Sequence, residues 1–267
     1  MHRIPPPTTP PPELEVPLRQ AADRLGPFAR PIVWFPVVSS TNDVALTLAA
    51  RGAAEGSVVA ADAQTTGRGR HGRTWASPAG AGVYASVVLR PRPKEAPLLT
   101  IAAGVGIAEG IEAATGLRPL LKWPNDVYIG DRKLAGILAE AATSGDGVQS
   151  VVLGFGINVA PAAYPLEVAA RATSLEAELG RPVDRGLVLA ECLAALAARY
   201  LQLQTRREAI ATAWRARAVS IIGRHVEWET AGVVERGIAE DIDDDGALRV
   251  RTGTGVVRVI AGEVRWV

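Results

Sequence analysis

Residues 67–72 read GRGRHG and match the G-x-G-x-x-G pattern of dinucleotide-binding loops letter for letter. A true match would impose a doubly wound parallel sheet, because the pattern joins a strand to a helix whose N-terminus holds a pyrophosphate. The residues that follow, RTWASPAGAG, include Pro78 and several glycines and cannot begin a helix. About 20 residues later, where an acidic residue should bind the ribose, stands the proline-broken basic stretch LRPRPKE. The sequence therefore argues against a dinucleotide-binding fold.

The same segment is better interpreted as a basic loop. TTGRGRHGRTWASPAGAG (residues 65–82) holds five glycines and a proline in 18 residues, which indicates a loop. Glycines let a backbone come close to a ligand, and Arg68, Arg70 and Arg73 offer planar forks that bind phosphate or carboxylate. Because these like charges repel, we expect the loop to be disordered by itself and ordered by an anionic ligand. A solvated surface loop is the alternative.

The composition limits the size and the partners of the protein. With 267 residues, 48% of them hydrophobic, the chain can form one large domain or one domain and a small module. A net charge of +1 gives no overall field for nucleic acid or a membrane. The one cysteine, Cys192, excludes an internal disulfide framework and a cysteine zinc site, and it indicates a reducing cytoplasm. The three histidines lack metal-ligand spacing.

The N-terminus has no secretory pattern, because no apolar core follows its first residues. Seven of the 19 prolines fall within the first 17 residues, so we expect residues 1–30 to form a disordered proline-rich leader. The longest apolar run, Leu98–Ala108, is too short to span a bilayer and is expected inside a buried helix.

The rest of the chain alternates between strand and helix patterns. Strands are predicted at residues 32–40, 57–64, 82–91, 119–123, 126–133, 133–141 and 149–159. Helices are predicted at residues 44–52, 97–116, 174–180, 184–204 and 206–217. From residue 219 the pattern changes to short alternating strands separated by Gly, Asp-Gly and Thr-Gly turns. We predict an α+β fold, with a mixed sheet covered by helices over residues 31–218 and a small β-barrel over residues 219–267.

A second segment rich in functional residue types is LKWPNDVYIGDRKLAGILAE (residues 121–140). Pro124 breaks the strand at a bend, where Asn125 and Asp126 expose polar side chains. Lys122 and Lys133 flank the bend, and strand pairing would bring both ammonium groups to one cleft. A lysine in an apolar strand is costly to bury unless it meets an anion, which favours a binding site. The alternative, for either lysine considered alone, is a charge exposed to solvent at the end of a strand.

Two shorter motifs lie at strand ends. SSTND (39–43) places two hydroxyls and an amide between a strand and a helix, where helix capping is the alternative explanation. GFGINV (154–159) puts small residues and Asn158 where backbone can approach a flat ligand, and tight packing is the alternative. The chain contains neither a G-x-S-x-G nucleophile elbow nor a P-loop.

Taken together, these motifs resemble the biotin protein ligases, also called biotin–[acetyl-CoA-carboxylase] ligases. SSTN, QTTGRGRHGRTWASPAG, LKWPNDVYIGDRKLAGILAE and VVLGFGINV occur in that family's order, and GALRVRTGTGVVRVIAGEV resembles its SH3-like C-terminal domain. The resemblance covers residues 33–267. It implies a catalytic domain like that of class II aminoacyl-tRNA synthetases, and a ligase that uses Mg-ATP to convert biotin into biotinyl-5′-AMP. Biotin then passes to a lysine of a biotin carboxyl carrier protein.

The resemblance also implies roles for individual residues. Those implied to contact biotin are Ser40, Thr41, Asn42, Gln64, Arg68, Gly69, Arg70, Lys133 and Gly136. Those implied on the nucleotide side are Arg70, Arg73, Trp75, Lys122, Trp123, Asn125 and Asn158. The implied catalytic residues are Arg70 and Lys133, which contact the reacting groups, and Asp126, near the attacking amine. No magnesium ligands are implied. His71 stands at a position that is often basic in the family and should weaken the charge of the loop without removing function.

The implied partner is a carrier domain of an acetyl-CoA or pyruvate carboxylase. Family members dimerise through sheet edges, so a homodimer is possible here. Some members begin with a DNA-binding winged helix-turn-helix, but only about 30 residues precede this catalytic domain, so we expect neither DNA binding nor a membrane partner. Two alternatives stay open: a lipoate or octanoate ligase of the same fold, and a non-enzymatic regulator that responds to biotin or a nucleotide.

Overall fold

The larger part of the chain is built around a seven-stranded mixed sheet with the order β1-β2-β3-β7-β6-β5-β4. The computed structural model describes residues 4–144, 147–162, 166–218, 222–230, 232–260, 262 and 264–267. The strands are β1 (Val33–Val38), β2 (Val58–Gln64), β3 (Gly82–Leu89), β4 (Leu120–Lys122), β5 (Asp126–Ile129), β6 (Arg132–Ser144) and β7 (Gly147–Asn158). β1 and β2 run parallel and the other neighbours run antiparallel. This sheet confirms the α+β prediction and excludes the parallel sheet of a dinucleotide-binding fold.

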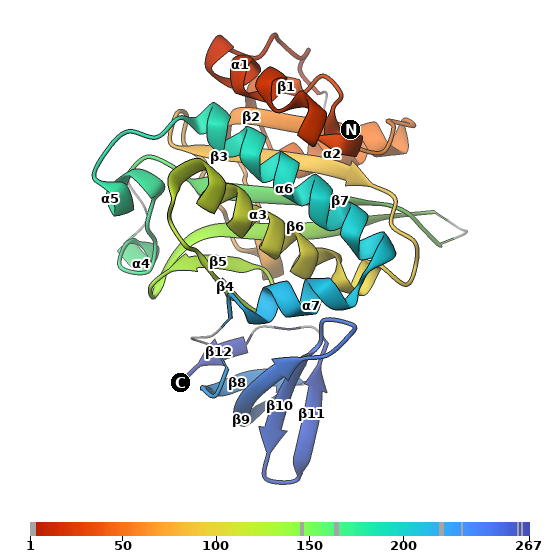
Figure 1. Ribbon diagram of the computed structural model, residues 1–267, viewed down its shortest axis with the longest axis vertical. Coiled ribbons are helices and arrows are strands. Elements are labelled where there is room, and N and C mark those ends of the chain that lie inside the picture. The colour runs from red at the N-terminus through yellow and green to blue at the C-terminus, as the bar shows by residue number, and fades with distance from the viewer. Residues whose placement is uncertain are drawn as a thin grey trace.

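Helices cover both faces of the sheet. On one face lie α3 (Leu99–Thr115) and α6 (Arg185–Thr205), side by side across the front of the sheet in Figure 1. They pack closely because Gly106 and Gly110 of α3 lie directly against the backbone of Leu196 and Cys192 of α6. On the opposite face, α2 (Thr41–Ala50) buries Val44 and an adjoining alanine against β1, β2 and β3. The rest of that face carries the polar residues singled out from the sequence.

The remaining helical segments lie at the edges of this core. They are α1 (Pro12–Gln20), η1 (Ala22–Arg24), η2 (Gly26–Phe28), η3 (Arg70–Gly72), η4 (Ala96–Leu98), α4 (Leu166–Ala169), α5 (Leu175–Leu179) and α7 (Glu208–Arg215). Residues 96–115 and α6 are each long and apolar enough to cross a membrane. Most of both segments is buried inside the protein, as predicted for the apolar run Leu98–Ala108.

The predicted disordered leader is wrong for residues 4–30. Thr8 pairs with Trp34 at the open edge of β1, where the Thr8 N–H donates to the Trp34 carbonyl at 2.9 Å. Leu14 and Phe28 are buried in the main core, and Arg24 donates two hydrogen bonds to Glu191 of α6, at 2.6 and 2.7 Å. The prediction of disorder rested on the high proline content of the segment and gave too little weight to its apolar residues. Proline is accepted in the first turn of a helix, as in α1, so the prolines do not prevent order here.

The C-terminal residues form a small five-stranded antiparallel sheet of SH3-like type, with the order β11-β10-β9-β8-β12. Its strands are β8 (His225–Thr230), β9 (Val233–Ile242), β10 (Leu248–Thr252), β11 (Gly255–Val259) and β12 (Val264–Trp266). It lies below α7 and β4 in Figure 1. The buried indole N–H of Trp123 donates to the Gly246 carbonyl at 2.8 Å, and Arg215 donates to Asp241 at 2.6 Å. The boundary predicted after residue 218 adjoins residues 219–221, which lie outside the described part.

Candidate functional site

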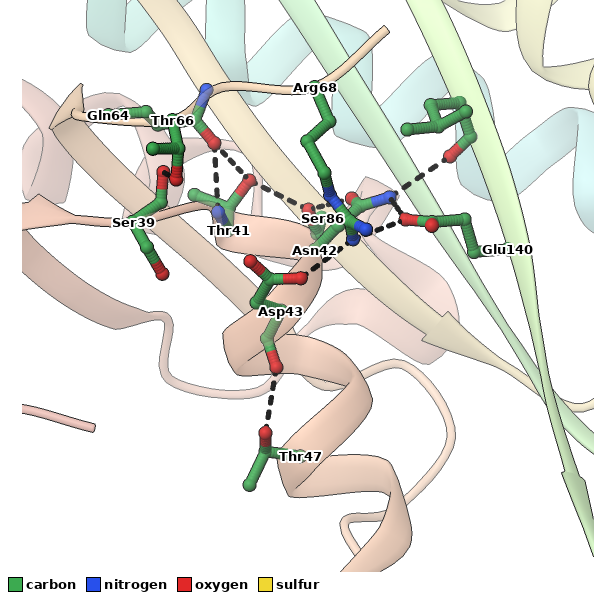
Figure 2. A network of polar contacts seen from close by, with 11 residues as sticks. Ser39, Thr41, Asn42, Asp43, Thr47, Gln64, Thr66, Arg68, Ser86 and Glu140 are labelled. Atoms are coloured by element: carbon green, nitrogen blue, oxygen red, sulfur yellow. Dashed lines mark hydrogen bonds and ion pairs between the residues drawn. The ribbon is translucent and has the colours of Figure 1, made fainter. Parts of the chain in front are cut away.

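The N-terminus of α2 turns its polar side chains toward the sheet. Ser40 occupies the N-cap position, yet its side chain makes no capping hydrogen bond, so capping does not explain the SSTND motif. The backbone N–H of Thr41 donates to Gln64 Oε1 at 2.8 Å, and the Thr41 hydroxyl lies 3.2 Å from the same oxygen. Gln64 Nε2 in turn donates to the Ser77 hydroxyl at 2.8 Å. These contacts form an uncharged polar cluster, of which Figure 2 shows Thr41 and Gln64.

Asn42 is fixed from three directions. Its Oδ1 atom lies 2.6 Å from the Ser86 hydroxyl, and its Nδ2 atom donates to Glu140 Oε2 at 2.7 Å and approaches the Leu138 carbonyl at 3.4 Å. The side chain lies directly on Gly154 of β7, where a Cβ atom would overlap the amide. Asn42 is buried, and each polar atom of its amide has a protein partner. The role that this geometry gives Asn42 is to fix the start of α2 on the sheet.

The basic loop is folded back on itself. Arg68 and Thr74 form a bridge, and the Gly69 N–H donates to the Arg73 carbonyl at 2.7 Å. The chain reverses at His71, which has a φ of 55°, a left-handed conformation that histidine tolerates better than most residues. The repulsion between the arginines is offset by groups of the protein itself.

Two arginines of the loop have different partners. Arg68 lies between two carboxylates, with its Nη2 atom 2.7 Å from Asp43 and 2.7 Å from Glu140 (Figure 2). Arg70 donates to Asn125 Oδ1 at 3.2 Å and to the carbonyl of Gly262, in the C-terminal part, at 3.1 Å. The loop therefore bridges α2 and β6 at one arginine, and the β4–β5 bend and the C-terminal part at the other.

Trp75 covers two of the glycines that the sequence had placed against a ligand. Gly136 of β6 and Gly156 of β7 are register partners, and the indole of Trp75 rests on both. A Cβ atom at Gly136 would lie 3.0 Å from Trp75 Cζ3 and 3.5 Å from the ammonium of Lys133. The indole N–H is buried against Gly156 and has no hydrogen-bond acceptor among the described residues.

The two predicted lysines lie on the same sheet face but meet different groups. Register partners Lys122 and Asp126, and likewise Tyr128 and Lys133, point to one side. Lys133 Nζ lies 2.6 Å from Asp126 Oδ1 and 5.4 Å from the centre of a Trp75 ring. Lys122 Nζ instead lies over Tyr128 and over Trp266 of β12, 5.3 and 5.4 Å from the ring centres. Lys133 therefore faces Asp126 and Trp75, and Lys122 faces the junction with the C-terminal sheet.

Charges surround the Tyr128 hydroxyl. Burial, and to a smaller extent the nearby Asp126 carboxylate, raise the pKa of Tyr128 to about 12, against the opposing effect of Arg171 and Arg73. Tyr128 thus stays protonated at neutral pH. The two arginines bring positive charge to the same end of the pocket as Lys133.

Three other nucleotide-side predictions fall on residues with structural contacts. Asn158 is buried and donates to the Thr173 carbonyl at 2.9 Å, next to the segment whose backbone pairs with Lys133. Trp123 precedes a cis proline at the predicted bend and is held by Gly246. Asn125, at the same bend, donates to the Ile137 carbonyl at 2.8 Å as well as accepting from Arg70.

Sequence reasoning missed four polar residues that support the pocket. They are Asp43, Ser77, Ser86 and Glu140. A signal for Glu140 was present: with Gly136 and Leu138 it follows the period of two along β6, and it is the one acidic residue of that strand. Ser86 gave no such signal, because it lies in a strand whose burial is complete along its length.

Comparison with known proteins gives consistent matches over both parts of the chain. Residues 34–158 match the Biotin/lipoate A/B protein ligase family, and residues 221–265 match the Biotin protein ligase C terminal domain. The biotin–[acetyl-CoA-carboxylase] ligase of Mycobacterium tuberculosis is 42% identical over 234 residues, which cover 84% of this chain and 85% of that protein. The bifunctional ligase/repressor BirA of Bacillus subtilis is 37% identical over 238 residues, or 87% of this chain and 73% of that protein. A structure of the Aquifex aeolicus biotin protein ligase in complex with biotin and ATP is 28% identical, with a TM-score of 0.77 over 88% of this chain and 98% of that one.

Proposed function

We propose a two-step reaction for this chain, which belongs to the biotin/lipoate A/B protein ligase family and is a biotin protein ligase. In the first step, a carboxylate oxygen of biotin attacks the α-phosphorus of ATP, forming biotinyl-5′-AMP and releasing pyrophosphate. In the second step, a lysine amine of a carrier protein attacks the acyl carbon, forming an amide and releasing AMP. Neither step needs a nucleophile from the protein, which agrees with the absence of a nucleophile elbow from the sequence.

The observation that carries the proposal is that the side chains lying on β7 change from hydrogen-bonding groups at Gly154 to an aromatic ring beside a cation at Gly156. Asn42 lies on Gly154 beside the Ser86 hydroxyl and the Glu140 carboxylate, whose charge is paired with Arg68. Trp75 lies on Gly156 beside the ammonium of Lys133. Residues two apart on a strand point to one face and are separated by about 7 Å. Such a site suits a ligand with a neutral hydrogen-bonding ring at one end and a carboxylate at the other. Biotin has this form.

The chemistry of the first step explains the positive charge at that end. A carboxylate and a triphosphate must come within bonding distance, so their repulsion has to be offset by preorganised cations. Lys133, held by Asp126, and Arg70, held by Asn125, are the groups that we assign to this task. In the second step Asp126 is placed beside Lys133, where it can accept the proton of the attacking amine.

We propose that magnesium enters as part of the Mg-ATP substrate. Magnesium is usually bound by one or two carboxylates together with substrate phosphates, so it needs no cage of protein ligands. Among the described residues no group of three or more His, Cys, Asp or Glu side chains could hold a metal ion, which fits delivery on the nucleotide. Bound there, the ion would supply further neutralisation of phosphate charge.

The physiological context is also proposed. The acceptor is a carrier domain of an acetyl-CoA or pyruvate carboxylase, in line with the name of the M. tuberculosis relative. We place the reaction in the cytoplasm, where the single buried thiol of Cys192 stays reduced; burial raises the pKa of this thiol, which makes it unreactive. Association of two copies through an open strand edge of the sheet is proposed on the resemblance alone.

Biotin-dependent exchange of labelled pyrophosphate into ATP tests the first step directly. We expect exchange with biotin, ATP and magnesium, and none when biotin is omitted. Folded protein that catalyses no exchange would refute the proposal. Transfer is then tested by adding a purified carrier domain and locating the biotinylated lysine by mass spectrometry.

A lipoate or octanoate ligase of the same fold is the alternative. The match at residues 34–158 is shared by biotin and lipoate ligases, but the match at residues 221–265 is to a domain of biotin protein ligases. The named relatives given above are biotin ligases as well, which favours biotin. Exchange assays with lipoate and octanoate in place of biotin distinguish the two.

A further inference from the structure

Arg68 is neutralised by the protein itself. Its Nη2 atom lies 2.7 Å from Asp43 Oδ1 in the first turn of α2 and 2.7 Å from Glu140 Oε2 on β6 (Figure 2). Two carboxylates therefore surround one guanidinium, and the local sum of charge is already negative. An arginine in this position has little excess charge to offer a substrate carboxylate.

Glu140 has a second contact at the same oxygen. Glu140 Oε2 accepts from Asn42 Nδ2 at 2.7 Å, while the other end of the Asn42 amide meets Ser86. One carboxylate thus joins a side chain of α2 to a side chain of the basic loop. Both contacts are charge-assisted, which makes them stronger and more directional than neutral hydrogen bonds.

We propose that Glu140 is a positioning residue for the biotin pocket. Together with Asp43 it holds Arg68 in place, and through Asn42 it fixes the start of α2. The part of the loop around residues 66–69 thus forms a fixed side of the biotin pocket. The part around Arg70, which reaches Asn125 and Gly262, is left to respond to the anionic groups of the reaction. This inference rests on the proposed function, because it assigns the fixed side of the pocket to the biotin ring.

The solvent exposure of Arg68, Asp43 and Glu140 favours a positioning role over a role in folding stability. The side chains of Arg68, Asp43 and Glu140 are 38%, 45% and 27% exposed. Ion pairs this open to water contribute little to folding stability. Their loss should therefore change the geometry of the pocket more than the stability of the fold.

The test compares Glu140→Gln and Asp43→Asn with the wild type in steady-state adenylate formation. Glu140→Gln is nearly isosteric and removes the charge that both contacts use, so we expect KM for biotin to rise about tenfold. KM for ATP should stay within about twofold. Asp43→Asn should have a smaller effect on biotin, since Asn42 keeps its partner. Glu240→Gln is the matched control, because it breaks the Arg251–Glu240 pair of 2.6 Å on strands of the C-terminal sheet.

Hydrogen exchange provides a readout that needs no ligand. The N–H groups of Thr66 and Gly69 donate to Ser39 and Arg73 at 2.9 and 2.7 Å, and they report the order of this part of the loop. We expect faster exchange at both in Glu140→Gln and no change in the control. Unchanged exchange together with an unchanged KM for biotin overturns the proposal, and so does an equal loss for biotin and ATP accompanied by a lower Tm. If the wild type forms no biotinyl-5′-AMP, the proposed function fails, while exchange at these two amides still decides whether Glu140 holds the loop in place.

Discussion

Trp75 rests on Gly156 so closely that a Cβ atom at the glycine would overlap the indole Nε1 atom. Trp75 belongs to a loop, and its ring lies on two neighbouring strands of the sheet. It covers Gly156 of β7 and also Gly136 of β6, the register partner of Gly156. The bare backbone at this point therefore sets the height of Trp75 above the sheet. Trp75 in turn lies beside Lys133, so the height of the ring affects the cationic end of the pocket.

We predict that Gly156→Ala displaces Trp75, lowers the stability of the fold by about 1–3 kcal/mol, the usual cost of overpacking, and raises KM for biotin. KM for biotin is the measurement, in the pyrophosphate exchange assay. Gly104→Ala is the control, because Gly104 is also buried but a Cβ atom there meets Leu121 at an ordinary 3.5 Å. An unchanged KM in Gly156→Ala would mean that the ring does not shape the biotin site.

The elements of the fold were predictable because their signals are local. Gly116, the last residue of the predicted helix 97–116, has a φ of 80° at the end of α3, and Gly130 of the β5–β6 turn has a φ of 56°. The seven strands of the main sheet follow the predicted apolar runs closely. The leader was predicted wrongly because its order depends on Leu14 and Phe28 meeting a core built from distant residues.

The motifs that supply the site residues could be recognised in the sequence, but the contacts among those residues could not. The structure shows a hydrogen bond from Thr41 to Gln64 and an ion pair between Lys133 and Asp126. Which carboxylates would neutralise Arg68 could not be predicted, because Asp43 and Glu140 are 97 residues apart in sequence and meet only after β6 has paired with β7. Partner choice of this kind depends on sheet register, which a single sequence does not give.

Arg70→Gly should release the reaction intermediate. The substitution removes the contacts to Asn125 and Gly262, so the loop no longer closes over biotinyl-5′-AMP. The free acyl-adenylate should then biotinylate lysines of an unrelated bystander protein, detected on a streptavidin blot. Arg30→Gly, at an exposed position outside the site, should leave the bystander unlabelled. Full retention of the intermediate by Arg70→Gly would contradict the closing role of the loop.

Lys133→Ala should reduce adenylate formation by about 2–4 kcal/mol of transition-state stabilisation, comparable to the loss of one preorganised donor. The loss should appear mainly in kcat, measured by pyrophosphate release at saturating biotin and ATP. Asp126 then lacks its cation, so the double variant with Asp126→Asn tests how much of the loss comes from an unpaired carboxylate. Lys94→Ala, on an exposed loop, is the control. Near-normal turnover of Lys133→Ala would remove the lysine from the mechanism.

The docking of the N-terminal segment should depend on pH through Glu191. Hydrogen bonds from Arg24 lower the pKa of Glu191 below its ordinary value of 4.5, although burial acts in the opposite direction. A lowered pKa in the folded state means that the contact stabilises the protein above the ordinary pKa and is lost as pH falls through the folded value. At pH 7 we expect Glu191→Gln to lower stability by about 0.5–1 kcal/mol, since Arg24 is largely exposed, and Tm by about 2 °C. The difference from the wild type should shrink as the pH falls below 4.5, whereas the exposed control Glu15→Gln should show none at either pH. A Tm difference that persists unchanged in acid would show that the Arg24–Glu191 pair is not its origin.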